Sequence, residues 1–192
     1  MFFWHLGIAV AVIYFTLGRR RIDYRVVLLG AILPDLIDKP IGRIFFEETF
    51  QTSRLFGHTL LFSVVALFAI QLVLRGDSAR TWFILPIAMI IHLASDAMWA
   101  DPQTLFWPAF GTQFPPNPTD SYWLDALLRV FTKPVEGIKE FAGLGFLIYL
   151  GVAYGLHKRD GLRAFIKTGR LEEDRISRRR QTLGQMGQGG DC

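Results

Sequence analysis

The sequence predicts an all-α protein, a polytopic membrane helical bundle of four to five spans, one of them short or re-entrant. Of its 192 residues, 51% are hydrophobic and only 20% are charged. The apolar residues come in blocks that end in basic turns, which is typical of membrane helices. This balance excludes a disordered chain. Because Cys192 is the only cysteine, a disulfide scaffold and a thiolate zinc cluster are excluded as well.

Five apolar segments form the predicted membrane domain, residues 1–156. In chain order they are residues 2–17, 26–38, 59–74, 82–99 and 141–156. The first segment is followed, not preceded, by a basic cluster, so we interpret it as an uncleaved span rather than a signal peptide. The second is shorter than the roughly 20 residues that cross a bilayer, so it spans or re-enters. The third and the last each end at a charged turn, and Pro86 could kink the fourth.

The basic residues predict the orientation of these spans. If every segment crosses, 15 of the 21 Lys and Arg residues fall on one side, which the positive-inside rule identifies as the cytoplasm. The N-terminus is then outside, the Pro- and aromatic-rich loop of residues 101–140 is extracytoplasmic, and the basic, partly disordered tail of residues 157–192 is cytoplasmic. We expect this tail to lie on anionic lipid. Nucleic acid is not an expected partner, since no aromatic residue is interleaved with the RISRRR motif of the tail.

Ionisable residues in apolar segments indicate a functional site, because each costs roughly 2.5–3.5 kcal/mol on insertion scales. Six such residues lie within these segments or at their ends: His5, Asp35, Asp38, His58, His92 and Asp96. With the orientation above, all six fall in the outer half of the membrane. Scattered solvated residues would not need to match in depth, so we expect these six to meet in one site.

Their spacing and chemistry favour a metal site. His92 and Asp96 are four residues apart and share one helix face, and Asp35 and Asp38 are three apart between two prolines. Imidazole and carboxylate ligands together suit a divalent metal, zinc first, with manganese, iron or magnesium as alternatives. A bound cation would also neutralise carboxylates in apolar surroundings.

The histidines also have roles that need no metal. His5 could be an interfacial histidine, His58 could cap its helix, and His92 could form a hydrogen-bonded pair with Asp96. We expect His157, in the basic turn after the last segment, to be a surface residue.

The carboxylates have similar alternatives. Asp35 could pair with Arg43 or Arg54, and Asp38 could end its helix or pair with Lys39.

Five short motifs follow one another in the order that is found in the YdjM-like family: His5, PDLID at 34–38, R-x-x-GHT at 54–59, HLASD at 92–96 and LFWP at 105–108. Over roughly residues 1–110 the chain thus resembles these LexA-regulated, membrane-bound, predicted metal-dependent hydrolases of bacterial inner membranes. The family is distantly similar to zinc-dependent phospholipase C. Gly57 stands where many members have threonine. The chain also has fewer histidines than the phospholipase site uses, which favours one or two metals over three.

The resemblance implies metal-dependent hydrolysis of a phosphoester or lipid-like substrate by a metal-activated water at the outer face of the inner membrane. The implied metal ligands are His5, Asp35, His58, His92 and Asp96. Asp38 would orient the water or act as general base. Arg54 could neutralise a phosphate oxygen, or be a plain interfacial arginine. Trp107 and Pro108 belong to a loop that could cover the substrate.

Two other functions could use the same residues. A small metal or proton transporter would need polar groups across the whole membrane, but the inner halves of the spans, such as AVAVIYFTL and VALFAIQLVL, are almost entirely apolar. A structural or regulatory membrane protein would keep the fold and bind no metal. Membrane lipids are the expected partners in every case, and the sequence predicts no particular oligomer.

Overall fold

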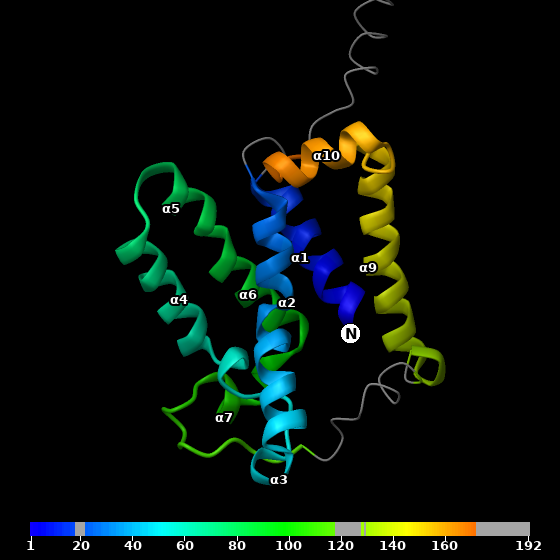
Figure 1. Cartoon of the computed structure of the whole chain (residues 1–192). Coiled ribbons are helices and arrows are strands. Elements are labelled where there is room, and N and C mark those ends of the chain that lie inside the picture. Colours follow the sequence, from blue (N-terminus) through cyan, green and yellow to red (C-terminus); the bar gives the residue numbers. More distant parts are fainter. Residues whose placement is uncertain (18–21, 118–127, 129, 172–192) are drawn as a thin grey trace, which may run out of the picture.

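A computed structural model describes residues 1–17, 22–117, 128 and 130–171, and these residues form helices and no strand. The predicted all-α fold is therefore confirmed within these ranges. The long helices form a bundle, α10 lies across one end of it, and α3 and α7 lie at the other end (Figure 1).

The bundle has long helices joined by short π and 3₁₀ segments, which are marked η. The elements are α1 (Phe2–Leu17), α2 (Tyr24–Pro40), η1 (Ile41–Phe45), α3 (Glu47–Phe50), η2 (Phe56–His58), α4 (Leu60–Val73), α5 (Gly76–Trp82), α6 (Ile84–Ser95), η3 (Met98–Ala100), α7 (Pro102–Leu105), α9 (Pro134–Ala153) and α10 (Arg159–Thr168).

The helix boundaries follow the apolar segments, with differences at polar ends. Segment 2–17 corresponds to α1, and segment 59–74 corresponds to α4, which Thr59 caps through its side chain. The helical region that contains segment 82–99 begins earlier than predicted, because the charged turn before this segment forms α5. Helix also begins before segment 141–156, since α9 starts with a proline at its first position, where no helical amide is needed.

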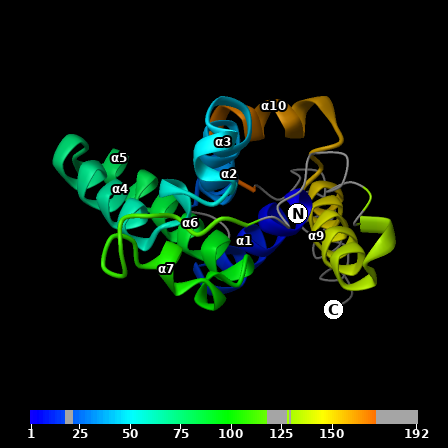
Figure 2. The same ribbon diagram turned by 90° about the horizontal axis from the view of Figure 1, so that it is seen from below.

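The core lies where α1, α2, α6 and α9 meet. Figure 2, which looks at the bundle from below, shows α1 and α6 between α4 on one side and α9 on the other. Ala9, Ala31 and Ala88 are fully buried in this core. Small residues of this kind let helix backbones approach one another closely in membrane proteins.

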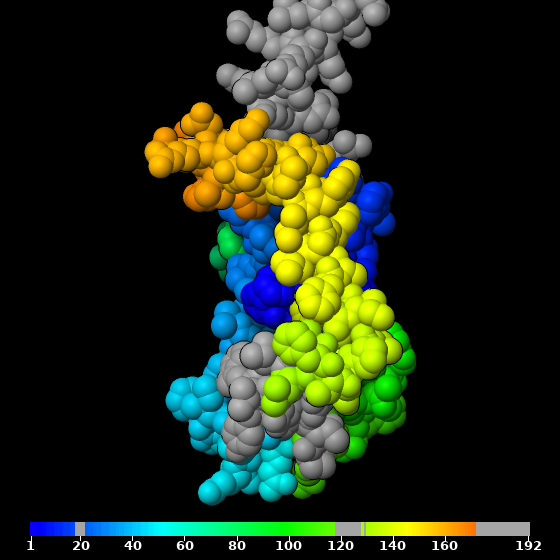
Figure 3. Space-filling model, turned by 90° about the vertical axis from the view of Figure 1, so that its right-hand side faces the viewer, coloured from blue at the N-terminus to red at the C-terminus, as the bar shows by residue number. Residues whose placement is uncertain are grey.

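A close contact joins α1 to α9 at two glycines. A Cβ atom on Gly7 would collide with the Cα atom of Gly143, and one on Gly143 would collide with the carbonyl oxygen of Phe3. The α9 helix covers this side of the bundle (Figure 3). Neither glycine can therefore gain a side chain unless the two helices move apart.

One continuous helical stretch of the described residues, Gly76–Ser95, is long and apolar enough to cross a membrane. The helices α1 and α4 are apolar but shorter, with 16 and 14 residues. Large apolar side chains are exposed on several helices, among them Phe15 of α1, Leu72 of α4 and Ile138 of α9. Exposed apolar surface of this extent marks interaction with a partner or a membrane.

The first part of the predicted tail is helical and docked onto the bundle. Residues 159–168 form α10, and the amide of Tyr24 donates a hydrogen bond of 2.7 Å to the carbonyl oxygen of Gly169. Leu171 is buried against the core. The rest of the tail, 172–192, lies outside the described residues, as do the basic cluster at 18–21 and part of the predicted 101–140 loop.

An ion pair strengthens this docking. Arg25 donates through Nη1 to the carbonyl oxygen of Ile166 at 2.6 Å and through Nη2 to Asp23 Oδ2 at 2.6 Å. Partial burial raises the pKa of the Asp23 carboxyl, but hydrogen bonds and charge from Arg25 outweigh burial, so the pKa lies below its ordinary value.

Candidate metal centre

Three buried histidines from different elements meet at one end of the core. His5 lies at the start of α1, His58 ends η2, and His92 lies in the last turn of α6, with residue exposures of 2%, 1% and 0%. Asp35 of α2 and Asp96, directly after α6, reach the same place. We call these five residues the histidine–aspartate centre. All five are predicted metal ligands, and the structure brings them together.

The protein holds the Nδ1 atom of two of these rings as a donor. His92 Nδ1 lies 2.7 Å from the carbonyl oxygen of Ala31, and a carbonyl can only accept, so this nitrogen carries the hydrogen. His58 Nδ1 lies 2.7 Å from Asp38 Oδ2. A carboxylate likewise accepts, so the same assignment holds for His58.

His5 takes the same tautomer through a serine. Its Nδ1 lies 2.6 Å from Ser95 Oγ, and the Ser95 hydroxyl donates its own hydrogen to the carbonyl oxygen of His92 at 2.9 Å. The hydroxyl therefore accepts from His5. In the neutral rings all three Nε2 atoms then carry a lone pair and face the centre, as in metal-ligating histidines.

The inner atoms are spaced as ligands of one ion are. His58 Nε2 and His92 Nε2 lie 3.3 Å apart. In the neutral tautomers assigned above neither nitrogen carries a hydrogen, whereas a protonated His58 would donate from Nε2 to His92. Two nitrogens bound tetrahedrally to zinc at 2.0–2.1 Å lie about 3.3 Å apart. Asp35 Oδ1 lies 3.5 Å from His58 Nε2, and Asp96 Oδ1 lies 3.1 Å from His5 Nε2. This donor set fits a divalent metal ion.

The donors form two overlapping groups, each able to hold an ion. One group is His5, His92 and Asp96, and the other is Asp35, His58 and His92; in each, the ligand atoms lie within 4.8 Å of one another. Both groups need the Nε2 atom of His92. Since one lone pair binds one ion, the two groups cannot both be complete at once.

Each carboxylate of the centre also bonds to a cationic side chain. Lys39 Nζ lies 2.6 Å from Asp35 Oδ2, so Asp35 pairs with this lysine rather than with an arginine. Arg54 Nη2 lies 3.1 Å from Asp96 Oδ2. Arg54, predicted to bind a phosphate oxygen, is thus placed next to the centre by its contact with Asp96.

Asp38 is fully buried and fixes the segment that carries His58. Its carboxylate accepts hydrogen bonds from the backbone amides of Leu55, Gly57 and His58 at 2.7, 2.8 and 3.0 Å, in addition to the bond from His58 Nδ1. A Cβ atom on Gly57 would lie 2.9 Å from the carbonyl oxygen of Pro34, which explains why this chain has glycine there. These contacts orient His58, and the general-base role of Asp38 stays a prediction.

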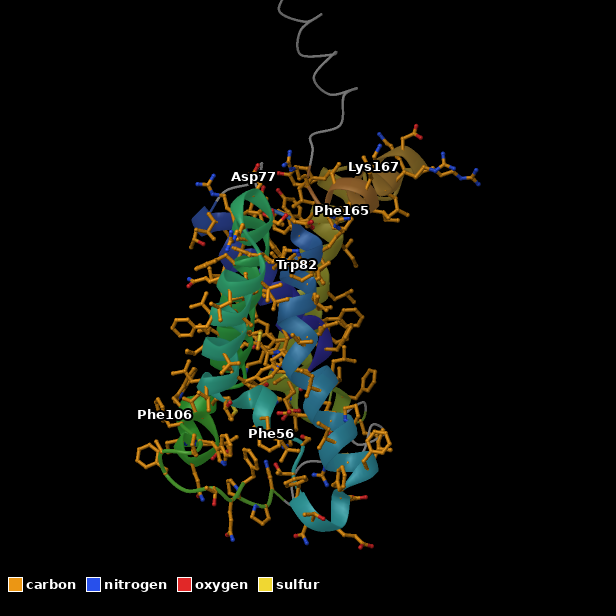
Figure 4. All side chains as sticks on the ribbon, turned by 60° about the vertical axis from the view of Figure 1, so that its left-hand side comes forward. Phe56, Asp77, Trp82, Phe106, Phe165 and Lys167 are labelled. Carbon is orange, nitrogen blue, oxygen red and sulfur yellow. The ribbon has the colours of Figure 1, made fainter. Side chains whose placement is uncertain are left out.

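Trp107, which precedes Pro108, packs beside the centre rather than into it. Its ring stacks on Phe114 with 5.6 Å between ring centroids and meets Phe56 edge-on at 5.3 Å. We call these three rings the aromatic cluster. Figure 4 places Phe56 at the opposite end of the molecule from Lys167. Coverage of a substrate by the loop of Trp107 and Pro108 stays a prediction.

Three contributors to the centre were not predicted from the sequence. Ser95 could have been suspected, because it lies three residues after His92 in the HLASD motif. Lys39 lies four residues after Asp35, which is the spacing of a helical ion pair. Ala31 contributes its backbone carbonyl, which leaves no signal in residue type.

The described residues define a class of protein: a helical bundle with a buried histidine–aspartate centre. The model of one family, described as YdjM inner membrane protein, matches residues 1–160. The chain therefore belongs to the YdjM family of inner membrane proteins. This confirms the resemblance drawn from the five motifs and extends it beyond residue 110. No curated protein and no solved structure matches the chain.

Proposed function

We propose that the protein is a multi-pass inner-membrane hydrolase that uses a divalent metal to cleave a phosphoester or lipid-like substrate at the outer face. The observation that carries the proposal is that Asp35, His58 and His92 meet in a buried group whose ligand atoms lie within 4.8 Å of one another, with the two Nε2 atoms 3.3 Å apart. In the neutral rings these nitrogens turn lone pairs toward each other, and a cation between them would bind both.

The centre offers three imidazoles and two carboxylates, of which each of the two groups would supply two imidazoles and one carboxylate to an ion. This mixture favours zinc, with manganese or iron as alternatives, while magnesium prefers oxygen ligands and fits less well. His5, His58 and His92 would bind through Nε2, and Asp35 and Asp96 through carboxylate oxygens. When bound, a zinc ion lowers the pKa of its water from 15.7 toward about 7, which provides a nucleophile at neutral pH.

The chain's own residues would keep the ligands in place and bind the substrate. The positioning residues are those that hold the Nδ1 atoms: Asp38 for His58, Ser95 for His5 and the Ala31 carbonyl for His92. Such partners fix ring orientation and raise ligand basicity. Arg54 is proposed to neutralise charge on the attacked group, since a guanidinium matches phosphate geometry.

The proposed topology places the N-terminus outside and the tail in the cytoplasm. Arg159, Arg163 and Lys167 are exposed and four residues apart on α10, which lies at the opposite end of the bundle from α3 and α7 (Figure 1). The positive-inside rule assigns that end to the cytoplasm, so the centre opens at the outer leaflet. Reporter fusions at the C-terminus test this orientation, and a periplasmic tail would contradict it.

The decisive test of the function is metal content. Detergent-purified wild type and the double variant His92→Ala/Asp96→Ala are washed with the same chelator and analysed by mass spectrometry. We expect about one or two equivalents of metal in wild type and none in the variant. His157→Ala, which removes an exposed histidine, should keep the metal. Absence of metal in wild type after addition of zinc and manganese would overturn the proposal.

Metal-loaded protein is then assayed against phosphodiesters and phospholipids, with the double variant as the inactive control. Turnover by wild type alone is the expected result. The family resemblance also implies expression under LexA control, which predicts that the transcript rises after DNA damage.

The two competing functions make different predictions. A structural or regulatory protein would show no bound metal and no turnover. A transporter would need polar groups along the whole bundle, but the buried Ser63 and Thr104 lie on α4 and α7, both of which contact η2, the element that carries His58. Metal uptake into vesicles loaded with a metal-sensitive dye would support transport instead.

A further inference from the structure

We propose that Lys39 and Arg54 together bind the phosphate group of the substrate beside the metal, so that the substrate is a phosphate ester and not a neutral ester. This inference rests on the proposed function. Both side chains are held next to the same part of the centre, because each bonds to a carboxylate that faces His58 Nε2. Asp35 Oδ1 lies 3.5 Å from that nitrogen and Asp96 Oδ2 lies 3.7 Å from it.

The exposure of the side chains shows from which side a ligand can reach the centre. The side chains of His5 and His58 are 3% and 1% exposed, so the histidines close the inner side. Those of Lys39 and Arg54 are 31% and 29% exposed. A substrate that approaches the ion from outside therefore meets these two cations.

The charges of the cluster also point to an anion. A divalent ion would balance Asp35 and Asp96, and Asp38 would balance one of the two cations, which leaves a net charge of about +1. Asp38 is fully buried behind His58, whereas both cations are on the accessible side. The excess positive charge therefore faces the incoming substrate, which suits a phosphate ester and gives no advantage to a neutral ester.

The donors of the two side chains suit simultaneous binding of carboxylate and phosphate. Arg54 contacts Asp96 through Nη2 at 3.1 Å, and a guanidinium carries five N–H donors in a planar fork. Lys39 donates to Asp35 and brings a second positive charge to the same place. The carboxylates thus hold both cations beside the centre, where the other N–H donors of Arg54 and the charge of Lys39 favour phosphate oxygens.

The phosphate could belong to a lipid headgroup or to a water-soluble ester. Phe56 of the aromatic cluster is partly exposed and offers apolar surface close to the centre. The experiment therefore presents phosphate in both forms. Full-length protein in phosphatidylcholine nanodiscs is loaded with Mn²⁺, and binding is followed by paramagnetic broadening of ³¹P resonances from inorganic phosphate or from phosphatidate in the disc.

The variants are Lys39→Gln and Arg54→Gln, with Lys39→Arg and Arg54→Lys as charge-retaining partners. Lys133→Gln is the matched control, since Lys133 also forms an ion pair with an acidic residue, Glu136, but is 57% exposed. Loss of one charge-assisted contact should lower phosphate affinity about ten- to hundredfold. Mn²⁺ is kept saturating and its bound amount is measured for each variant, because Lys39 and Arg54 also hold carboxylates of the centre. At equal bound Mn²⁺, the charge-retaining variants should recover most of the lost phosphate affinity, and Lys133→Gln should match wild type.

The outcomes separate this inference from the function on which it rests. Broadening of phosphatidate or of inorganic phosphate that depends on Lys39 and Arg54 supports the inference, and the stronger of the two signals identifies the source. If wild type holds Mn²⁺ but the glutamine variants bind phosphate unchanged, the inference is overturned and the metal site stands. If wild type holds no metal, the proposed function and this inference both fail.

Discussion

The Nε2 atoms of His58 and His92 lie 3.3 Å apart, while the Nδ1 atom of each ring donates to an acceptor of α2. On the side of each ring that faces away from the centre, α2 thus holds both rings, through Asp38 and Ala31. Their Nε2 atoms therefore face each other at the centre. In the neutral rings both nitrogens can bind one ion, and with His58 protonated they form a hydrogen-bonded pair, so metal content distinguishes the two arrangements.

Removal of the metal should lower the stability of the whole bundle. An ion that binds the folded protein alone stabilises it by about 2.7 kcal/mol at a hundredfold excess over its Kd. Chelation should therefore lower the Tm of wild type measured in detergent, and added zinc should restore it. The variant His92→Ala/Asp96→Ala should show the same Tm with and without chelator. A chelator effect of equal size in that variant would contradict the prediction.

Replacement of Asp38 by asparagine should weaken metal binding. Partners of this kind typically contribute ten- to a hundredfold in metal affinity, because they set the tautomer and orientation of the ligating ring. We expect Asp38→Asn to raise the metal Kd by about that factor, measured by competition with a chromophoric chelator. Asp77→Asn, at the far end of the molecule (Figure 4), is the control. If metal affinity is unchanged and turnover alone is lost, Asp38 acts as the general base instead.

Ser95 should contribute to metal binding by holding His5. Ser95→Ala removes the acceptor of the His5 Nδ1 hydrogen, so the ring can adopt the other tautomer and turn its lone pair away. Metal affinity should fall by about tenfold, whereas Ser78→Ala, an exposed serine of α5, should have no effect. Metal affinity of the Ser95 variant equal to that of wild type would show that His5 is not a ligand.

The glycine contact between α1 and α9 gives a prediction that is independent of any metal. Gly143→Ala should destabilise the protein by about 1–3 kcal/mol, as overpacking usually does, because its Cβ would collide with the Phe3 carbonyl. Gly145→Ala is the matched control on the same helix, where nothing lies within 4 Å of the added atom. The control should keep or slightly raise the Tm, since alanine favours helix.

The contact that attaches α10 to the bundle should weaken at acidic pH and should not change with pH above that range. The pKa of Asp23 is lower in the folded protein than its ordinary value, so its ion pair with Arg25 contributes stability above about pH 4. That contribution is lost as the pH falls through the lowered pKa. Hydrogen exchange at the Tyr24 amide, which bonds to Gly169, should therefore accelerate in acid beyond its intrinsic rate. Asp23→Asn should remove this dependence on pH.

Much of the architecture could be predicted because apolar blocks and charged turns mark where membrane helices begin and end. The boundaries of α1 and α4 follow directly from such blocks. The start of α5 could not be found in this way, since Gly76 and Asp77 look like a turn but are held in helix next to α6. The docking of α10 was also missed, because it depends on a backbone contact between Tyr24 and Gly169.

The residues that meet in the histidine–aspartate centre could be predicted, but not the groups that hold them in place. Histidine and aspartate in apolar segments are costly, so their presence alone draws attention to residues such as His92 and Asp96. Their partners carry no such cost. Ala31 acts through its carbonyl and Ser95 is common in membrane helices, so the tautomers became assignable only from packing.

The hydrogen bonds of the centre have a consequence for how the chain is made. The partners of His5 and His92 lie 90 and 61 residues away in sequence, and both bonds need α6. A nascent chain that has released only α1 and α2 therefore carries His5 without Ser95, and Asp38 without His58, in apolar surroundings. Synthesis of α6 supplies the last of these hydrogen-bond partners. A chain truncated before Ser95 should therefore be a preferred substrate of membrane quality-control proteases.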